Sequence, residues 1–374
     1  MNSVAATKIQ PRRLSAIAFH GEPGTANLRD FADGIAERMR AAGHAETDAQ
    51  DQPGLVFNFV DPQRPRPFRR QSQGTFVVGV TEVTEVPDDI LATAYPMLVK
   101  SLSNLFIFIT PSEDGGRDTY FITLEQGYYT ARAREGEAYF EEIYGHVAPL
   151  ASTRLVINNV FRHDLPASLT EGNERTRSIY DAGKRLDAMG LLPTAFPIQD
   201  ILSERDMQHV RRLFGLGGLS YGNVSTREDE NSFWMSARGV DKSNLREVGR
   251  DVLLISDYLP EDDAMVVRVP EGVEPRSASV DAIEHWGLYN EHPEIGAIVH
   301  IHAWMEGIQS TRVNYPCGTY ELAQEVAELA RQEPDPACAV IGLKNHGLTI
   351  TGRSLEEIFD RIEGRIIRQV PMEP

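Results

Sequence analysis

The run Ala297-Ile298-Val299-His300-Ile301-His302 decides how this sequence is interpreted, together with the tripeptide Asn345-His346-Gly347. The run is apolar and carries two histidines one residue apart, which predicts the end of a β-strand. Alternate side chains of a strand share a face, so His300 and His302 are expected to point the same way. Neutral imidazole is the commonest metal ligand, so a third histidine, His346, would complete a catalytic metal site with an open fourth position. Strand histidines can also simply be packed or solvated, and the pair alone leaves both interpretations open.

The bulk composition is that of a globular protein and excludes several function classes. The chain has 374 residues, which is enough for two domains. Its formal net charge of −18 argues against general binding to nucleic acid or to an anionic membrane, because both need a basic surface. Two cysteines offer no disulfide framework, no apolar stretch is long enough to span a membrane, and the amino terminus lacks a signal-peptide apolar region. We therefore expect a soluble, cytoplasmic protein.

Residues 1–165 predict an α/β or α+β domain of a type that we do not recognise. Helical spacing of apolar residues occurs around 28–39, 90–100 and 138–146. Strands are expected at Leu14–Phe19, Leu55–Val60, Phe76–Val83, Asn104–Thr110, Tyr120–Leu124 and Leu155–Val160. A linker with a connecting helix is expected at 166–190, and a second domain at 191–374.

The second half of the chain resembles the class II aldolase/adducin family from about residue 201 to residue 366. The family fold is an α/β/α domain around a largely antiparallel sheet, and its catalytic members hold a divalent metal, commonly zinc. The resemblance implies His300, His302 and His346 as the metal ligands, with iron or manganese as alternatives to zinc. Six motifs in order carry the resemblance: Gly222–Ser225, Ser236–Asp241, Ser279–Asp281, His292–His302, Pro316–Thr319 and Asn345–Gly347.

The resemblance also implies a catalytic role for Asp281. The family places an acid/base residue beside the metal at this point, a glutamate in fuculose-phosphate aldolase and an aspartate in ribulose-phosphate 4-epimerase. A carboxylate there can take up and return a proton. The local sequence alone equally allows Asp281 to cap a helix over Ala282–Tyr289, and the two roles can coexist.

The residues that bind the substrate phosphate in this family are matched only in part. Asn223, Gly239 and Ser279 are present, whereas Val280 and Arg238 stand where the family has hydroxyl side chains. Losing hydroxyl donors weakens a phosphate site, but an arginine can clamp a carboxylate or phosphate with two hydrogen bonds. We therefore expect a small anionic substrate other than a simple terminal sugar phosphate.

The connection between His302 and Pro316 is shorter than in the aldolases, where it carries a tyrosine that reaches a neighbouring subunit's site. Tyr315, Tyr320 and Glu306 are the candidate replacements for that acid, and the first domain is a candidate to cover the site. The resemblance implies a homo-oligomer, because family members form rings that are commonly tetramers.

Three functions fit these residues. The first is a metal-dependent lyase that acts by retro-aldol cleavage or decarboxylation on a small anionic hydroxy-carbonyl substrate, through a metal-stabilised enediolate. The second is an epimerase, dehydratase or iron-dependent oxygenase on the same scaffold. The third is a non-catalytic, adducin-like interaction protein, which would have no need of a buried histidine cluster. Fold analogy does not choose between the first two.

Overall fold

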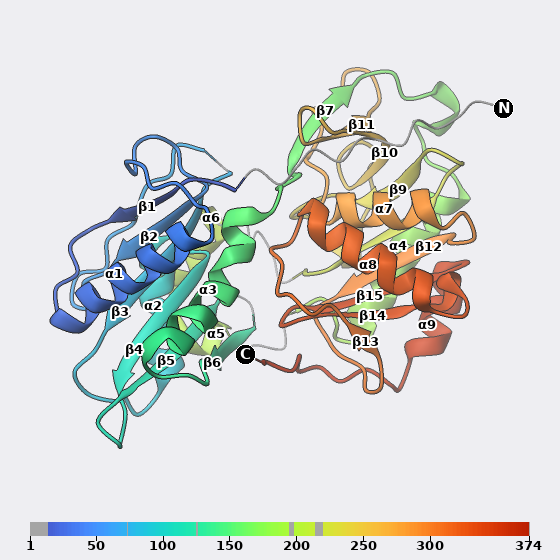
Figure 1. The fold of residues 1–374 in the computed structure, drawn as a ribbon. Coiled ribbons are helices and arrows are strands. Elements are labelled where there is room, and N and C mark those ends of the chain that lie inside the picture. Colours follow the sequence, from blue (N-terminus) through green and yellow to red (C-terminus); the bar gives the residue numbers. More distant parts are fainter. Residues whose placement is uncertain (1–13, 73, 125, 194–197, 214–219, 374) are drawn as a thin grey trace.

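The computed structural model describes residues 14–72, 74–124, 126–193, 198–213 and 220–373. It contains two β-sheets with helices packed against them, which confirms the expected mixed α/β class (Figure 1). The glycine-rich run at 214–219 lies outside the described residues. None of the helices in these ranges is both long and apolar enough to cross a membrane.

The first sheet has six strands in sequence order, four parallel and then two antiparallel. Helices α1 (Ala26–Ala41) and α3 (Gly136–Ser152) pack together on one face, and α2 (Ile90–Ser101) packs on the other. Alternate residues of the strands therefore enter different cores, which explains why the second, third and fourth strands are apolar along most of their length. The strands are β1 (Ile17–His20), β2 (Leu55–Phe59), β3 (Phe76–Glu82), β4 (Leu105–Pro111), β5 (Arg117–Thr123) and β6 (Gly127–Thr130).

The second sheet has nine strands in the order β13-β14-β15-β12-β8-β9-β10-β11-β7. All neighbours from β14 to β11 are antiparallel, and only the two outermost strands pair in parallel. The strands are β7 (Asn158–Arg162), β8 (Asn223–Arg227), β9 (Phe233–Ser236), β10 (Val252–Leu259), β11 (Ala264–Arg268), β12 (Ala297–Ile301), β13 (Gln309–Ser310), β14 (Val340–Leu343) and β15 (Gly347–Gly352).

Four helices flank the second sheet in two pairs. Helix α7 (Ala282–Glu291) packs against α8 (Tyr320–Gln332), and α4 (Glu174–Ala188) packs against α9 (Leu355–Ile362). Both pairs contribute buried side chains to one large core around β12. Three short 3-10 segments complete this half at Ala167–Leu169, Lys242–Asn244 and Pro336–Cys338.

The chain passes between the two sheets in an order that the sequence analysis did not predict. The strand expected to end the first domain is β7, and it pairs with β11 in the second sheet. The expected connecting helix, α4, buries Ile179 and Leu186 in the second core. The short helices α5 (Ile198–Ile201) and α6 (Glu204–Leu213) instead pack against α2 of the first domain. An apolar run predicts a strand without identifying its partner strand. The strand expected at 155–160 therefore pairs in the second sheet and not in the first. The domain boundaries at 165 and 190 stay a prediction.

Candidate metal centre

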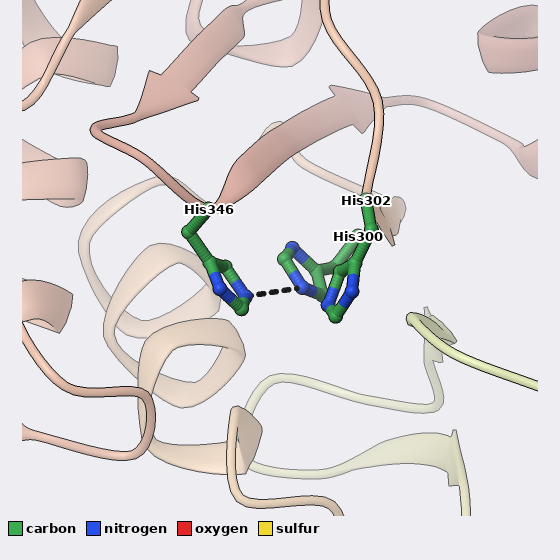
Figure 2. Close-up of side chains that lie close together, drawn as sticks. All are labelled: His300, His302 and His346. Atoms are coloured by element: carbon green, nitrogen blue, oxygen red, sulfur yellow. Dashed lines mark hydrogen bonds between the residues drawn. The ribbon is translucent and has the colours of Figure 1, made fainter. Parts of the chain in front are cut away.

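Three histidines meet at one end of strand β12 (Figure 2). His300 lies on β12, His302 directly follows the strand, and His346 lies in the turn between β14 and β15. One ring nitrogen from each of the three lies within 4.8 Å of the others. The His300 and His346 rings are stacked, with their Nε2 atoms 3.2 Å apart. The structure thus brings together the three residues that the two motifs single out.

Two glycines allow neighbouring chain segments to pass close to the histidine strand. Gly222 has a φ of +69°, and a Cβ atom on it would lie 2.3 Å from the carbonyl oxygen of His300. A Cβ atom on Gly347 would lie 2.3 Å from the carbonyl oxygen of Ile301. A larger residue would clash at either position, and φ > 0 at Gly222 is strained for other residues. The glycines of both motifs therefore position Asn223 and His346 beside the two strand histidines.

The protonation of the cluster suits metal binding. His300 Nδ1 lies 3.0 Å from the backbone carbonyl of Leu348, an acceptor, so Nδ1 carries the proton and Nε2 presents its lone pair. Burial lowers the pKa of His300 to about 4 and that of His346 to about 3. Burial also holds the pKa of His302 well below its usual value. All three imidazoles are therefore neutral at pH 7, the form in which they bind metals.

The spacing of the nitrogens also fits a metal ion. Zinc–nitrogen bonds of about 2.0–2.1 Å in a tetrahedral site hold two ligand nitrogens roughly 3.3 to 3.4 Å apart. The 3.2 Å separation between His300 Nε2 and His346 Nε2 is close to that value. Three neutral nitrogen donors suit zinc, and they also suit iron and other first-row metals.

A row of polar side chains extends from the histidines across the sheet. Asn223, His300 and Thr349 lie directly opposite one another on β8, β12 and β15, so they share one face. Helix α7 begins over this row and brings Asp281 to Asn223, whose Nδ2 donates to Asp281 Oδ2 at 2.7 Å. Ser279 Oγ donates to the same oxygen at 3.4 Å. The predicted residues Asn223, Ser279 and Asp281 therefore form one hydrogen-bonded group beside His300.

Asp281 is buried, with only 7% of its surface exposed. Burial raises the pKa of its carboxyl group, and the hydrogen bonds from Asn223 and Ser279 and the charge of Lys242 partly offset that rise. Asp281 occupies the N-cap position of α7, but its side chain makes no capping hydrogen bond. The helix-cap alternative is therefore wrong for the side chain, because its carboxylate oxygen accepts from Asn223 and Ser279 instead.

A cavity of about 530 Å³ lies between the first domain and the turn that carries His346, the one histidine of the cluster in its lining. Gln126, in the turn before β6, donates from its Nε2 to the backbone carbonyl of His346 at 2.8 Å, so the first domain touches the metal-binding turn directly. The polar residues of the lining include Arg70, Asn104 and Gln126 from the first domain and Arg238, Asn345 and His346 from the second.

Some of the remaining predicted site residues line the cavity, and the others lie elsewhere in the structure. Arg238 is exposed and lines the cavity, and the adjacent Gly239 accepts a hydrogen bond from Arg276 through its carbonyl. Tyr315 also lines the cavity. Tyr320 does not, because at the start of α8 its ring stacks on Tyr258 and under Arg154. Glu306 is an exposed turn residue outside the lining. Of the three candidate acids, only Tyr315 faces the site.

Two residues that the sequence analysis did not propose also lie here. Cys317 places its Sγ 3.4 Å from His346 Nε2. Glu284, one turn after Asp281 on α7, is buried and accepts a hydrogen bond from Thr349 through Oε1. Its Oε2 has no partner among the described residues. The spacing of three residues between Asp281 and Glu284 was a usable signal, because it places both carboxyl groups on one helix face.

Glu284 leads to a prediction about stability and pH. Burial, with a smaller contribution from Asp281, raises its pKa from the ordinary 4.5 to about 8. The folded protein therefore keeps a proton that the unfolded chain releases above pH 4.5. The retained proton stabilises the folded state. Its contribution to the free energy of unfolding is fully present below pH 4.5 and is lost as the pH rises to 8, at up to about 1.4 kcal/mol per pH unit.

The variant Glu284→Gln has no proton to release, so its free energy of unfolding should fall less than that of the wild type between pH 5 and pH 8. Urea denaturation at several pH values measures this slope. Glu356→Gln, an exposed position on α9, is the matched control and should behave like the wild type. A Glu284→Gln variant with the wild-type slope would show that Glu284 is ionised in the fold.

Part of this chain is similar in sequence to a protein family and to proteins of known name. The family described as the Class II Aldolase and Adducin N-terminal domain matches residues 207–312. A methylthioribulose-1-phosphate dehydratase of Citrobacter koseri is 27% identical over 173 residues, which cover 38% of this chain and 78% of that protein. A protein of the same name from Leptospira biflexa is 28% identical over 107 residues, 28% of this chain and 45% of its own length. The match thus covers less than half of the length of this second relative.

Part of this chain also aligns with solved structures of other proteins. The YgbL protein of Escherichia coli aligns over 50% of this chain and 82% of its own, with 18% identity and a TM-score of 0.34. An L-fuculose 1-phosphate aldolase aligns over 54% of this chain and 82% of its own, with 17% identity and a TM-score of 0.35. By this sequence match, residues 207–312 of the chain are similar to the class II aldolase and adducin family.

Proposed function

We propose that this protein is a divalent-metal-dependent lyase of the class II aldolase type, acting on a small anionic hydroxy-carbonyl substrate. The observation that carries the proposal is the cluster of His300, His302 and His346 beside the buried Asp281. A divalent ion held by the three imidazoles, zinc first and iron or manganese as alternatives, would supply Lewis-acid stabilisation of negative charge on the substrate oxygens.

In this proposal Asp281 is the acid/base residue. Its raised pKa makes its carboxylate a stronger base than that of an exposed aspartate, so it can accept the hydroxyl proton in retro-aldol cleavage or a proton from the carbon next to the carbonyl in dehydration. The hydrogen bond from Asn223 fixes the orientation of the carboxylate. Arg238 would hold an anionic group of the substrate, and Tyr315 is the candidate acid for the leaving fragment, because both side chains line the cavity.

Dehydration is the second candidate reaction, favoured by the relatives named methylthioribulose-1-phosphate dehydratase. Dehydration and carbon–carbon cleavage both begin with removal of a proton by a base such as Asp281, from a carbon in dehydration and from a hydroxyl group in retro-aldol cleavage. They differ in the bond that breaks next, carbon–oxygen in one case and carbon–carbon in the other. The histidines and Asp281 suit both reactions.

The test is a screen of the full-length protein on hydroxy-carbonyl acids and phosphates, with zinc, manganese or iron, and with or without a chelator. Mass spectrometry distinguishes the loss of water from the release of a carbonyl fragment or carbon dioxide. We expect turnover that the chelator abolishes and the metal restores. Turnover that survives complete metal removal would contradict the proposal, and metal binding without any turnover would favour the adducin-like alternative.

We further propose that the protein is a cytoplasmic homo-oligomer, of which a tetramer is one form. A strand-end metal site needs a wall that excludes water, because a dry site strengthens its electrostatic interactions. The first domain supplies one such wall within the same chain. Light scattering of the full-length protein is expected to give a mass above that of one chain. A fully active monomer would show that no neighbouring subunit is required.

A further inference from the structure

The first domain presents an unbalanced positive charge to the cavity. Arg70 is half-buried in the cavity wall. Its Nη1 donates to the backbone carbonyl of Thr75 at 3.1 Å and to Asn104 Oδ1 at 3.2 Å. Both acceptors are neutral, so they orient the guanidinium group without balancing its charge. Burial lowers the pKa of Arg70, and among the described residues no carboxylate opposes that effect.

Other partly buried arginines of the first domain are paired. Arg38 forms an ion pair with Glu141, and Arg117 forms one with Asp30. Arg70 makes no ion pair within the ranges that the structure describes, although the chain carries 55 acidic and 37 basic residues. Removing a charge from water without a counter-ion is unfavourable. An anion that enters the cavity would supply the missing counter-ion.

A continuous wall connects Arg70 to the metal-binding turn. Asn104, which contacts Arg70, directly precedes Leu105, and Leu105 pairs with Thr123 in the sheet. Thr123 Oγ1 accepts a hydrogen bond from the backbone of Gln126 at 3.3 Å, and Gln126 contacts the carbonyl of His346. All of these residues line the same cavity. Its volume of about 530 Å³ is in the usual range for small-molecule sites, roughly 300 to 1,000 Å³.

We infer that Arg70 binds an oxyanion, a phosphate or a carboxylate, at the end of the substrate remote from the metal. The part of this inference that concerns the substrate rests on the proposed function, because the reacting end must lie near His346. The oxyanion site itself does not depend on the metal. Between the two ends the cavity is partly apolar, with Leu105 and Leu124 on its first-domain wall, and so fits a hydrocarbon segment. The first domain would thereby select the length and terminal charge of the substrate.

The test uses the full-length protein stripped of metal, titrated calorimetrically with inorganic phosphate and, separately, with malonate. The wild type is expected to bind at least one of them saturably. Arg70→Met should bind at least about 10-fold more weakly, because the charge-assisted hydrogen bonds of the guanidinium group are lost. The matched control is Arg69→Met, an exposed neighbour outside the lining, which should bind like the wild type. The two titrants show which oxyanion the site prefers.

Three results would overturn the inference. They are no saturable binding of either anion to the wild type, equal binding by Arg70→Met and the wild type, or loss of binding only in Arg238→Met. Melting temperatures check that the variants fold. If Arg70→Met does not fold, Arg70→Lys replaces it. The lysine ammonium group should bind the anion measurably more weakly than the guanidinium group of the wild type. Failure of metal binding would leave this titration unchanged, so the two proposals fail separately.

Discussion

Replacing His302 with alanine is expected to remove the bound metal and reduce turnover by more than about 100-fold. Changes to groups that merely support a metal ligand cost about 10- to 100-fold, so loss of a ligand should exceed that range. His302 follows β12 at its end, so most of the fold should persist. Metal per chain, measured by plasma mass spectrometry, and turnover on the substrate identified by the screen give the result. His300→Ala should behave in the same way.

His163→Ala is the control for these variants, because His163 is exposed and lies outside the histidine cluster, with its ring nitrogen 3.4 Å from the carbonyl oxygen of Pro270. It should retain both metal and turnover. If His300→Ala and His302→Ala both kept stoichiometric metal, the assignment of the ligands would be wrong.

Replacing Asp281 with asparagine is expected to reduce turnover by roughly 100-fold or more while the metal stays bound. The amide oxygen of asparagine can still accept the hydrogen bond from Asn223, so the local shape should be kept. The amide cannot take up the proton. Because burial disfavours the charged carboxylate, the variant should unfold at the wild-type temperature or above it at neutral pH.

Measurements of turnover, metal content and melting temperature on Asp281→Asn separate three roles. A loss of turnover alone supports the acid/base role. A loss of metal would make Asp281 a ligand, and wild-type turnover would remove it from the mechanism.

The sequence predicted the histidine cluster well because short patterns encode it. Alternation along a strand places His300 and His302 together, and the two glycines mark where neighbouring segments approach them. Asp281 was ambiguous, since a helix cap and an acid/base residue can occupy the same position. The contact that separates the two roles comes from Asn223, 58 residues earlier, and local sequence carries no information about it.

The features that the sequence did not predict depend on long-range packing. Nothing near β7 indicates that it pairs with β11 rather than with the first sheet. The short run that contains Arg70 has the composition of a solvated loop, and only the docking of the two domains places this arginine on the cavity. Whether a charged side chain has a counter-ion depends on how the domains pack. The order of residue types along the sequence therefore could not indicate Arg70 as a binding residue.

The central claim is that His300, His302 and His346 hold one divalent metal ion. The most direct measurement is the metal content of the full-length wild-type protein after incubation with zinc, manganese or iron and removal of unbound metal by dialysis. The account predicts about one ion per chain of at least one of these metals, released by a strong chelator. A wild-type protein that folds but retains only traces of all three would contradict it.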